Sequence, residues 1–151
     1  MTFPEKFITF VRSEKQYIIM RHYPSKRISP RHISALRDNE IFVFGSNLQG
    51  QHGGGAALAA YRNFGAVWGE GVGLHGQTYA IPTMHGGTEE IQPYVDEFIR
   101  FASDNPTLKF LVTRIGCGIA GFSDEEMAPL FQGATDVENI YLPEVWREIL
   151  G

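Results

Sequence analysis

Two glycine-rich segments have the composition of anion-binding loops. The first runs from Gly45 to Gly55 and ends in three consecutive glycines, and the second runs from Gly116 to Phe122. Without side chains, backbone N–H groups can approach an anion closely, and the N-terminus of a following helix adds positive potential. Three glycines before a helix lose conformational entropy that a plain turn would not need to lose. We therefore favour phosphate binding over a flexible turn.

The second segment, Gly-Cys-Gly-Ile-Ala-Gly-Phe, also matches the dinucleotide fingerprint G-x-G-x-x-G. A Rossmann-like enzyme would place an acidic residue near the end of the next strand, and Glu144 has roughly that position. The following helix, however, is expected to begin after Phe122, later than in a Rossmann unit. A Rossmann-like dinucleotide enzyme is therefore our second interpretation.

Four side chains in or beside these segments could take part in chemistry. Asn47 can donate and accept hydrogen bonds, and His52 could act as a general base, bind phosphate or have no role. Asp124 could position a water, although a helix-capping role is favoured. Cys117 could be a nucleophile, but no His–acid partner is placed by the sequence, so we favour a small residue in a tight loop. With one cysteine in the chain, we expect neither a disulfide nor a zinc site, and we predict no metal and no cofactor.

The elements that would position these loops alternate between strands and helices. Apolar runs predict strands at residues 41–44, 78–81, 108–115 and 139–142. Helical spacing predicts helices at 56–64, from Thr88 to the break at residues 104–106, from Ser123 onward, and at 145–150. This order indicates an α/β domain with a mostly parallel sheet and helices on both faces. Ligands bind such sheets at the carboxyl ends of the strands, where both loops lie, so the two loops could hold a diphosphate from opposite sides.

Helix ends carry the clearest local signals. Ser123 with Glu126 forms a capping box, and Thr88 is expected to cap the helix that it precedes. Gly65 is expected to close the helix before it. We also expect residues 66–76 to form a mobile flap and residues 17–20 to form a short strand. Tyr79, Trp68 and Trp146 are expected in the core.

Composition places the chain among ordinary globular domains. It has 151 residues, of which 43% are hydrophobic and 20% charged. Residues 1–37 contain eight Lys or Arg and two Glu, whereas the remainder contains five basic and fifteen acidic residues. We therefore divide the chain into a basic N-terminal extension, residues 1–30, and a nucleotide-binding domain, residues 31–151. The basic arm could touch nucleic acid, but its charges are scattered, and we favour packing on the acidic body. The single cysteine and the lack of a signal or an apolar span predict a cytoplasmic protein with no membrane partner.

In their order along the chain, these features resemble the macro domain family. Asn47 after a strand, then Gly53-Gly54-Gly55-Ala56 and Gly65, resemble its first loop and helix. The segment Gly76 to Pro82 is similar to its middle strand, and Arg114 to Phe122 is similar to its second phosphate loop. The likeness covers about residues 40–142, and the pairing of the two loops makes it specific.

The resemblance implies a three-layer α/β/α sandwich that binds ADP-ribose or an ADP-ribosylated molecule. Asn47 would face the distal ribose and Phe122 would pack beside it. In the enzymatic version, which would hydrolyse an ADP-ribosyl bond, Asn47 would orient a water or the ribose, with His52 or Asp124 as base. The residues expected at the ligand are Gly45, Ser46, Asn47, Gly53, Gly54, Gly55, Ala56, Gly116, Cys117, Gly118, Ile119, Ala120, Gly121 and Phe122.

The chain departs from the family's hydrolytic members at their catalytic positions. One class carries an aspartate just after the glycine run, where this chain has Ala56 and Ala57. Another uses a lysine near the end of the middle strand and an acid in the second loop, where this chain has Thr83-Met84 and Ala120. A binding module without turnover is therefore the alternative to an ADP-ribosyl hydrolase.

Overall fold

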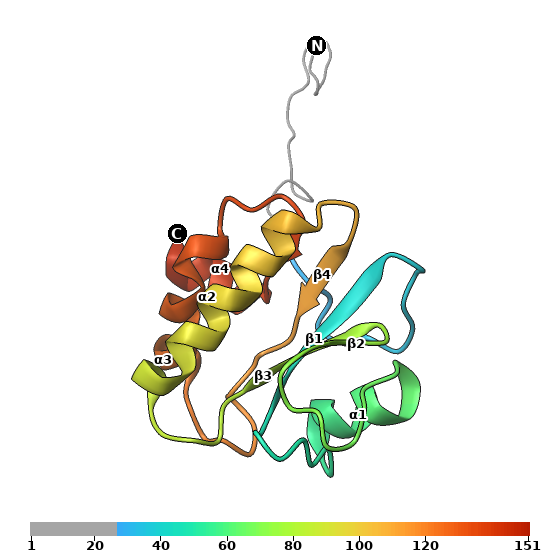
Figure 1. Cartoon of the computed structure of the whole chain (residues 1–151). Helices are drawn as coiled ribbons and strands as arrows, with labels where there is room; N and C mark the ends of the chain where they lie inside the picture. Colours follow the sequence, from blue (N-terminus) through green and yellow to red (C-terminus); the bar gives the residue numbers. More distant parts are fainter. Residues whose placement is uncertain (1–26) are drawn as a thin grey trace.

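The computed structural model describes residues 27–151, which form an α/β domain around a five-stranded mixed sheet (Figure 1). The strand order is β2-β3-β1-β4-β5. The strands are β1 (Glu40–Ser46), β2 (Gly73–His75), β3 (Thr78–Pro82), β4 (Lys109–Val112) and β5 (Ile140–Tyr141). β1 lies at the centre and pairs in parallel with β3 and β4, β4 pairs in parallel with β5, and only the edge strand β2 is antiparallel. The expected mostly parallel sheet is thus confirmed.

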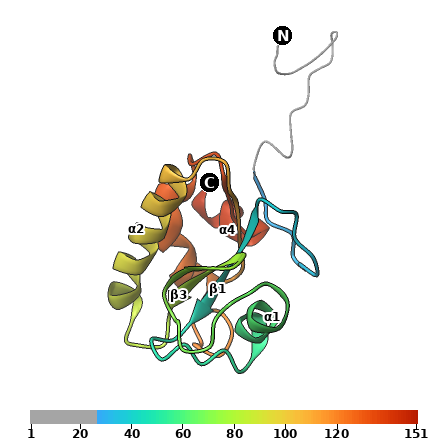
Figure 2. The same ribbon diagram turned by 45° about the vertical axis from the view of Figure 1, so that its right-hand side comes forward.

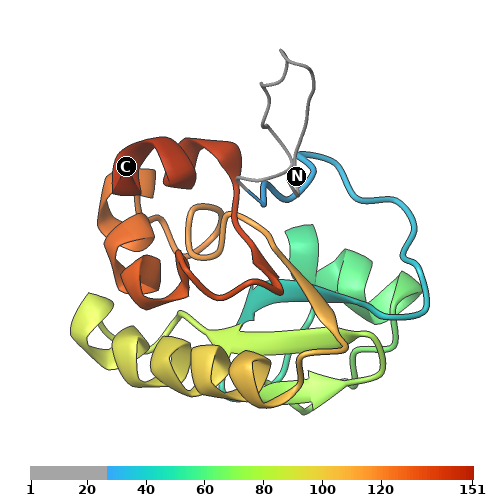
Figure 3. The same cartoon turned by 90° about the horizontal axis from the view of Figure 1, so that it is seen from above.

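Helices cover both faces of this sheet. They are α1 (Gly55–Asn63), α2 (Thr88–Asp104), α3 (Asp124–Met127), the 3₁₀ helix η2 (Ala128–Ala134) and α4 (Glu144–Leu150). Figures 1 and 2 show α1 on one side of the sheet and α2 on the other. Figure 3 shows the C-terminal helical segment, in orange and red, away from α1.

Alternation along β1 explains why both faces are apolar. Ile41 and Val43 belong to a large core that includes residues of α2, η2 and α4. Phe42 and Phe44 belong to a smaller core, formed with Ala57, Ala60 and other residues around α1. Because successive strand side chains point to opposite faces, one run of apolar residues supplies both cores.

Of the two N-caps predicted from the sequence, one is confirmed and one is not. The capping box at Ser123 is confirmed: its Oγ accepts from Glu126 N at 3.1 Å, and Glu126 Oε1 accepts from Ser123 N at 2.9 Å. The prediction that Thr88 caps α2 is wrong by one residue. The N-cap is Gly87, whose N–H donates to Glu90 Oε1 at 2.8 Å.

Segment 66–76, which was expected to be a mobile flap, contains β2 and packs on the first loop. Residues 73–75 pair with β3 across a two-residue turn in which Gly76 has φ +59°. Gly69 N donates to Gly50 O at 2.9 Å, and Gly71 lies so close to Asn47 O that no Cβ would fit there.

Only residues 27–30 of the expected extension are described, and they attach to the sheet. Ile28 forms a parallel bridge with Leu142, and the buried Ser29 donates from Oγ to Val112 O at 2.6 Å. The strand expected at residues 17–20 lies outside the described residues. Among residues 27–151, no helix combines the length and apolar character needed to cross a membrane.

Candidate functional site

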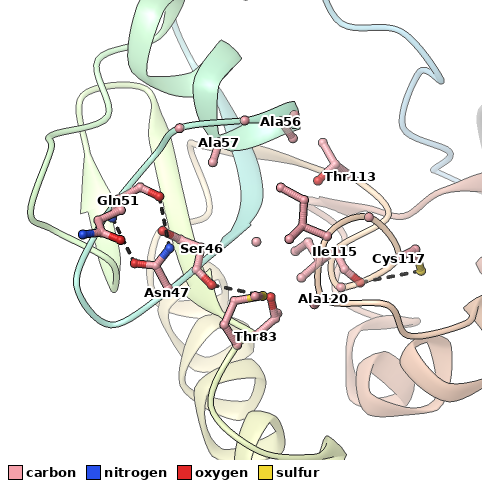
Figure 4. A pocket seen from close by; sticks show the side chains of 18 of the residues that line it. Ser46, Asn47, Gln51, Ala56, Ala57, Thr83, Thr113, Ile115, Cys117 and Ala120 are labelled. Carbon is pink, nitrogen blue, oxygen red and sulfur yellow. Dashed lines mark hydrogen bonds between the residues drawn. The ribbon is translucent and has the colours of Figure 1, made fainter.

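A cleft of about 670 Å³ opens at the carboxyl ends of the central strands. After β1 the chain passes to α1 on one face, whereas after β3 and β4 it passes to α2 and α3, which pack on the other face. The connections therefore diverge on both sides of β1, which makes this edge a topological switch point where α/β proteins bind ligands. Figure 4 shows the cleft between the segments that follow β1 and β4.

The first loop is shaped by Asn47 (Figure 4). Its Oδ1 accepts from Gln51 N at 2.9 Å, and its Nδ2 donates to Gln51 O at 3.0 Å. Leu48 N donates to His85 Nε2 at 2.8 Å, which ties the loop to the segment after β3. The Asn47 carboxamide therefore fixes the backbone of the loop that it begins.

The glycine run then enters α1 with its backbone exposed. Gly54 is the N-cap of α1 and has no side chain that could accept a hydrogen bond. Within the described residues, the first N–H groups of α1 therefore have no side-chain acceptor. A Cβ placed at Gly53 would meet no atom within 4 Å, and φ at that residue is not positive. Neither backbone conformation nor protein packing requires glycine at position 53, which leaves open space beside the backbone.

The second loop is a tight turn with one open side. Gly116 has φ +82°, and a Cβ there would lie 2.8 Å from Met127 Sδ, so this glycine is required by the fold. Phe122 N donates to Gly116 O at 2.8 Å, and Gly121 N donates to Gly118 O at 3.0 Å. A Cβ at Gly118 would meet nothing within 4 Å. Within residues 27–151, no hydrogen bond uses the N–H groups of Gly118, Ile119 or Ala120.

Asp124 fastens the second loop to the body of the domain. Its carboxylate accepts from Arg114 Nε at 2.9 Å and Nη2 at 2.6 Å, and from Trp146 Nε1 at 2.8 Å. The hydrogen bonds from Arg114 hold the pKa of Asp124 below its usual value. Cys117 lies nearby with Sγ 3.5 Å from Asp124 Oδ1, and burial, with the neighbouring carboxylate, raises the pKa of its thiol to about 11. The thiol is therefore protonated at neutral pH and a poor nucleophile.

The two loops approach each other across the cleft at Ile119. This side chain is 79% exposed, and its Cδ1 lies 3.4 Å from where a Cβ of Gly54 would be. An isoleucine so exposed at a loop tip packs on little of its own protein. Its position narrows the cleft between the open backbone of the first loop and that of the second.

The structure brings most of the expected ligand residues together. Those lining the cleft are Gly45, Ser46, Asn47, Gly53, Gly54, Gly55, Ala56, Gly116, Cys117, Gly118, Ile119 and Ala120. Gly121 and Phe122 do not line it; they close the turn of the second loop behind the lining residues.

Two of the three suggested catalytic residues lie outside the lining. His52 is fully buried, with Nδ1 3.1 Å from Ser46 Oγ and Nε2 2.9 Å from Val67 O. Because a carbonyl oxygen can only accept, Nε2 carries a proton, and both ring nitrogens are engaged. Asp124 is likewise occupied by its ion pair. This geometry favours structural roles for both residues. For His52 that differs from the alternative of no role, and for Asp124 the role is an ion pair, because Ser123 caps the helix.

Several lining residues were not anticipated as site residues: Gln51, Ala57, Trp68, Thr83, Met84, Thr113, Arg114 and Ile115. The expectation that Trp68 is a core residue is wrong, since the residue is 50% exposed. Tyr79 and Trp146, at 4% and 0%, are confirmed as core. The aromatic type alone could not separate these positions; only the packing of segment 66–76 on the first loop brings Trp68 to the cleft.

The lining offers hydrogen bonds and very little acid–base chemistry. Its only charged side chain among the described residues is Arg114, and it contains no His, Asp or Glu. Residues 27–151 contain no cluster of three or more His, Cys, Asp or Glu that could hold a metal ion. The arrangement can therefore bind an anion through backbone N–H groups and one guanidinium group.

Comparisons with known protein families, curated proteins and solved structures give no match to this chain.

Proposed function

We propose that this chain binds ADP-ribose or a related nucleoside diphosphate in the cleft between its two glycine-rich loops. The observation that carries the proposal is the pair of open backbone surfaces at one switch point. At Gly53 and Gly118, no protein atom occupies the space where a side chain would be. Glycine at a position that the fold does not require is typical of close approach by a ligand. Two such surfaces facing one cleft suit the two phosphates of a diphosphate.

Size and charge support the same ligand class. A cleft of about 670 Å³ lies within the range of small-molecule sites. Arg114 lines the cleft, but two of its nitrogens donate to the carboxylate of Asp124, so the pair adds little net charge and the backbone N–H groups are the main donors for a ligand. A diphosphate would therefore meet backbone N–H donors and, among the described lining residues, no unpaired carboxylate.

The lining supports binding without turnover more than hydrolysis. A hydrolase needs a general base or a polarised water near the scissile bond, and the part of the lining formed by residues 27–151 contains no His, Asp or Glu. The Asn47 carboxamide holds the first loop through two hydrogen bonds. The alternative, an ADP-ribosyl hydrolase, would require the ligand itself or a rearranged loop to supply the base.

The family we propose is the macro domain family, on the motifs around Asn47 and the two loops. The mixed sheet with helices on both faces is compatible with such a sandwich. The expected partner is then ADP-ribose itself or an ADP-ribosylated molecule.

The test combines binding and turnover. Isothermal calorimetry with ADP-ribose, ADP and ribose 5-phosphate should give the tightest binding for ADP-ribose. Incubation with an ADP-ribosylated protein should release no ADP-ribose, and Asn47→Ala should behave like the wild type in this assay. Release by the wild type that is lost in Asn47→Ala would establish the hydrolase instead. If no nucleotide binds to the wild type, the proposed function is wrong.

A further inference from the structure

A backbone N–H of the first loop donates to a histidine side chain. Leu48 N lies 2.8 Å from His85 Nε2, a contact between residues 37 positions apart in sequence. Leu48 directly follows Asn47, and His85 directly follows Met84, and both of these preceding residues line the cleft. The contact therefore joins two walls of the cleft, the loop after β1 and the segment after β3.

The geometry fixes which nitrogen of each ring carries a proton. A backbone N–H can only donate, so His85 Nε2 accepts from Leu48 and the proton of the neutral ring is on Nδ1. His52 has the opposite arrangement, because its Nε2 donates to Val67 O while its Nδ1 faces Ser46 Oγ, a hydroxyl that can donate or accept. A second proton would leave both hydrogen bonds of His52 possible, whereas it would remove the one that His85 accepts.

We propose that His85 is a positioning residue for the first loop, which it holds only while its imidazole is neutral. Histidine side chains gain their second proton between about pH 5 and pH 8. In the protonated ring both nitrogens are donors, so Nε2–H would face Leu48 N–H and the two groups would move apart. The hydrogen bond is thus present at the upper end of this range and is lost as the pH falls. The inference rests on the proposed function and adds to it an affinity that depends on pH.

Other titratable groups lie on the elements packed around this contact. The segment that packs on the first loop carries His75 and Glu70, whose Nε2 and Oε1 are 3.6 Å apart. The first turn of α2 carries Glu89 and Glu90, and Glu90 caps its own helix. Among residues 27–151, no carboxylate forms an ion pair with His85. His75 is the group whose titration could be confused with that of His85, so it provides the control.

Nuclear magnetic resonance tests the contact without a ligand. In long-range ¹H–¹⁵N spectra at about pH 8, the His85 ring should carry its proton on Nδ1. As the pH is lowered to about 5.5, the amide signal of Leu48 should shift with the same midpoint as the His85 ring. A proton on Nε2 at the higher pH, or a Leu48 amide that does not follow the ring, would overturn the inference.

Calorimetry with ADP-ribose measures the consequence for the ligand. This probe is suitable because its diphosphate is esterified at both ends and keeps its charge over the same range. The affinity of the wild type should fall roughly 2- to 12-fold from about pH 8 to about pH 5.5, the effect of one hydrogen bond between neutral groups.

Two variants of His85 separate its hydrogen bond from its charge. His85→Gln should bind ADP-ribose equally at both pH values, because the glutamine oxygen reaches the position of Nε2 and does not titrate. His85→Asn is the matched control, with the same carboxamide on a side chain one carbon shorter. It should bind at both pH values as weakly as the wild type does at the lower one. His75→Gln should keep the pH dependence of the wild type, and its loss in that variant would assign the effect to the pair with Glu70 instead.

The sign of the pH effect distinguishes positioning from simple electrostatics. A positive charge near the cleft would by itself raise the affinity for a diphosphate. A wild-type affinity that rises or stays constant as the pH falls would therefore overturn the positioning role, even if ADP-ribose binds as proposed. If no nucleotide binds the wild type at either pH, the proposed function fails and the effect on affinity with it, whereas the resonance experiment still decides the contact between His85 and Leu48.

Discussion

At the scale of single residues, glycines in one loop have separable roles. Gly116 is required by the fold, because of its positive φ and the side chain of Met127, whereas Gly118 borders open space. We expect Gly118→Val to fold normally and to weaken ADP-ribose binding roughly 10- to 150-fold, the effect of losing a hydrogen bond to a charged group of about 1.5–3 kcal/mol. Calorimetry and thermal unfolding measure the two properties. Gly116→Val is the contrasting variant, and it should lower the thermal stability of the protein. Unchanged affinity in folded Gly118→Val would contradict a phosphate site at this loop.

The Asp124–Arg114 pair predicts a pH-dependent stability. The pKa of Asp124 is lowered in the folded state, so its carboxylate stabilises the protein above the ordinary pKa of about 3.9, and this contribution is lost as the pH falls through the lowered value. Arg114 is more than half exposed, so we expect Asp124→Asn to lose only about 1 kcal/mol at pH 7. The difference from the wild type should shrink below about pH 5 in urea unfolding experiments. Glu125→Gln, a neighbouring exposed charge, is the control; a difference that is constant between pH 7 and pH 3 would argue against the ion pair.

At this scale, the sequence predicted which glycines line the cleft, but it did not predict which aromatic and histidine side chains are buried. Positions such as Gly53 and Gly118 could be assigned to the cleft because local backbone chemistry follows from the glycine pattern and the end of a strand. The exposure of His52 and Trp68 could not be predicted, because it depends on how segment 66–76, which contains Trp68 and has no strong periodicity, packs on the first loop. In the structure His52 is buried, whereas Trp68, which was expected in the core, lies in the cleft wall.

At the scale of elements, most segments were predicted close to their observed bounds, including the short helices α3 and α4, whereas the three-residue strand β2 was missed. α2 has a continuous apolar stripe and appeared where expected, as did β1 and β3. The strand expected at 108–115 is shorter, because after Val112 the chain turns toward the cleft. β2 was missed because three residues show no alternation; the turn Gly76-Gln77 between it and β3 was the available signal.

Segment 66–76 should behave as a support of the first loop. Gly71 lies directly against the backbone of Asn47, and no Cβ fits between them. Gly71→Ala must therefore push the segment away, breaking the contact that holds both Trp68 and the first loop. We expect a loss of stability of about 1–3 kcal/mol, the usual range for overpacking, together with weaker nucleotide binding. Gly69→Ala, where a Cβ would meet nothing but φ is +96°, serves as a control for backbone strain alone. Chemical denaturation measures the stability of both variants, and calorimetry measures their nucleotide affinity. Equal losses in Gly71→Ala and Gly69→Ala would show that the contact with Asn47 is unimportant.

At the scale of the whole molecule, the strand order brings the exposed backbone of both glycine-rich loops to the carboxyl ends of the central strands. Within residues 27–151, β1 is the strand whose neighbours on both sides have connections that pass to the opposite face, and the cleft forms beside it. The general architecture and the location of the loops followed from the alternation of elements. The strand order and the added edge strand did not, because pairing partners are set by packing between distant segments.

The segment before β1 supports stability from a position next to the cleft, which it does not line. Ser29, on the segment that pairs with Leu142, donates to the carbonyl of Val112, and both residues are buried. Ser29→Ala leaves this carbonyl without its side-chain donor, which should cost about 1–2 kcal/mol and lower the Tm by roughly 2–8 °C. Affinity for ADP-ribose should stay within about twofold of the wild type, since Ser29 does not line the cleft. Gly118→Val should show the reverse pattern, with affinity lost and Tm kept. The double variant should then combine the two losses independently. A stability loss in Ser29→Ala that also removes binding would mean that the Ser29–Val112 contact is coupled to the cleft through Thr113, which follows Val112 and lines the cleft.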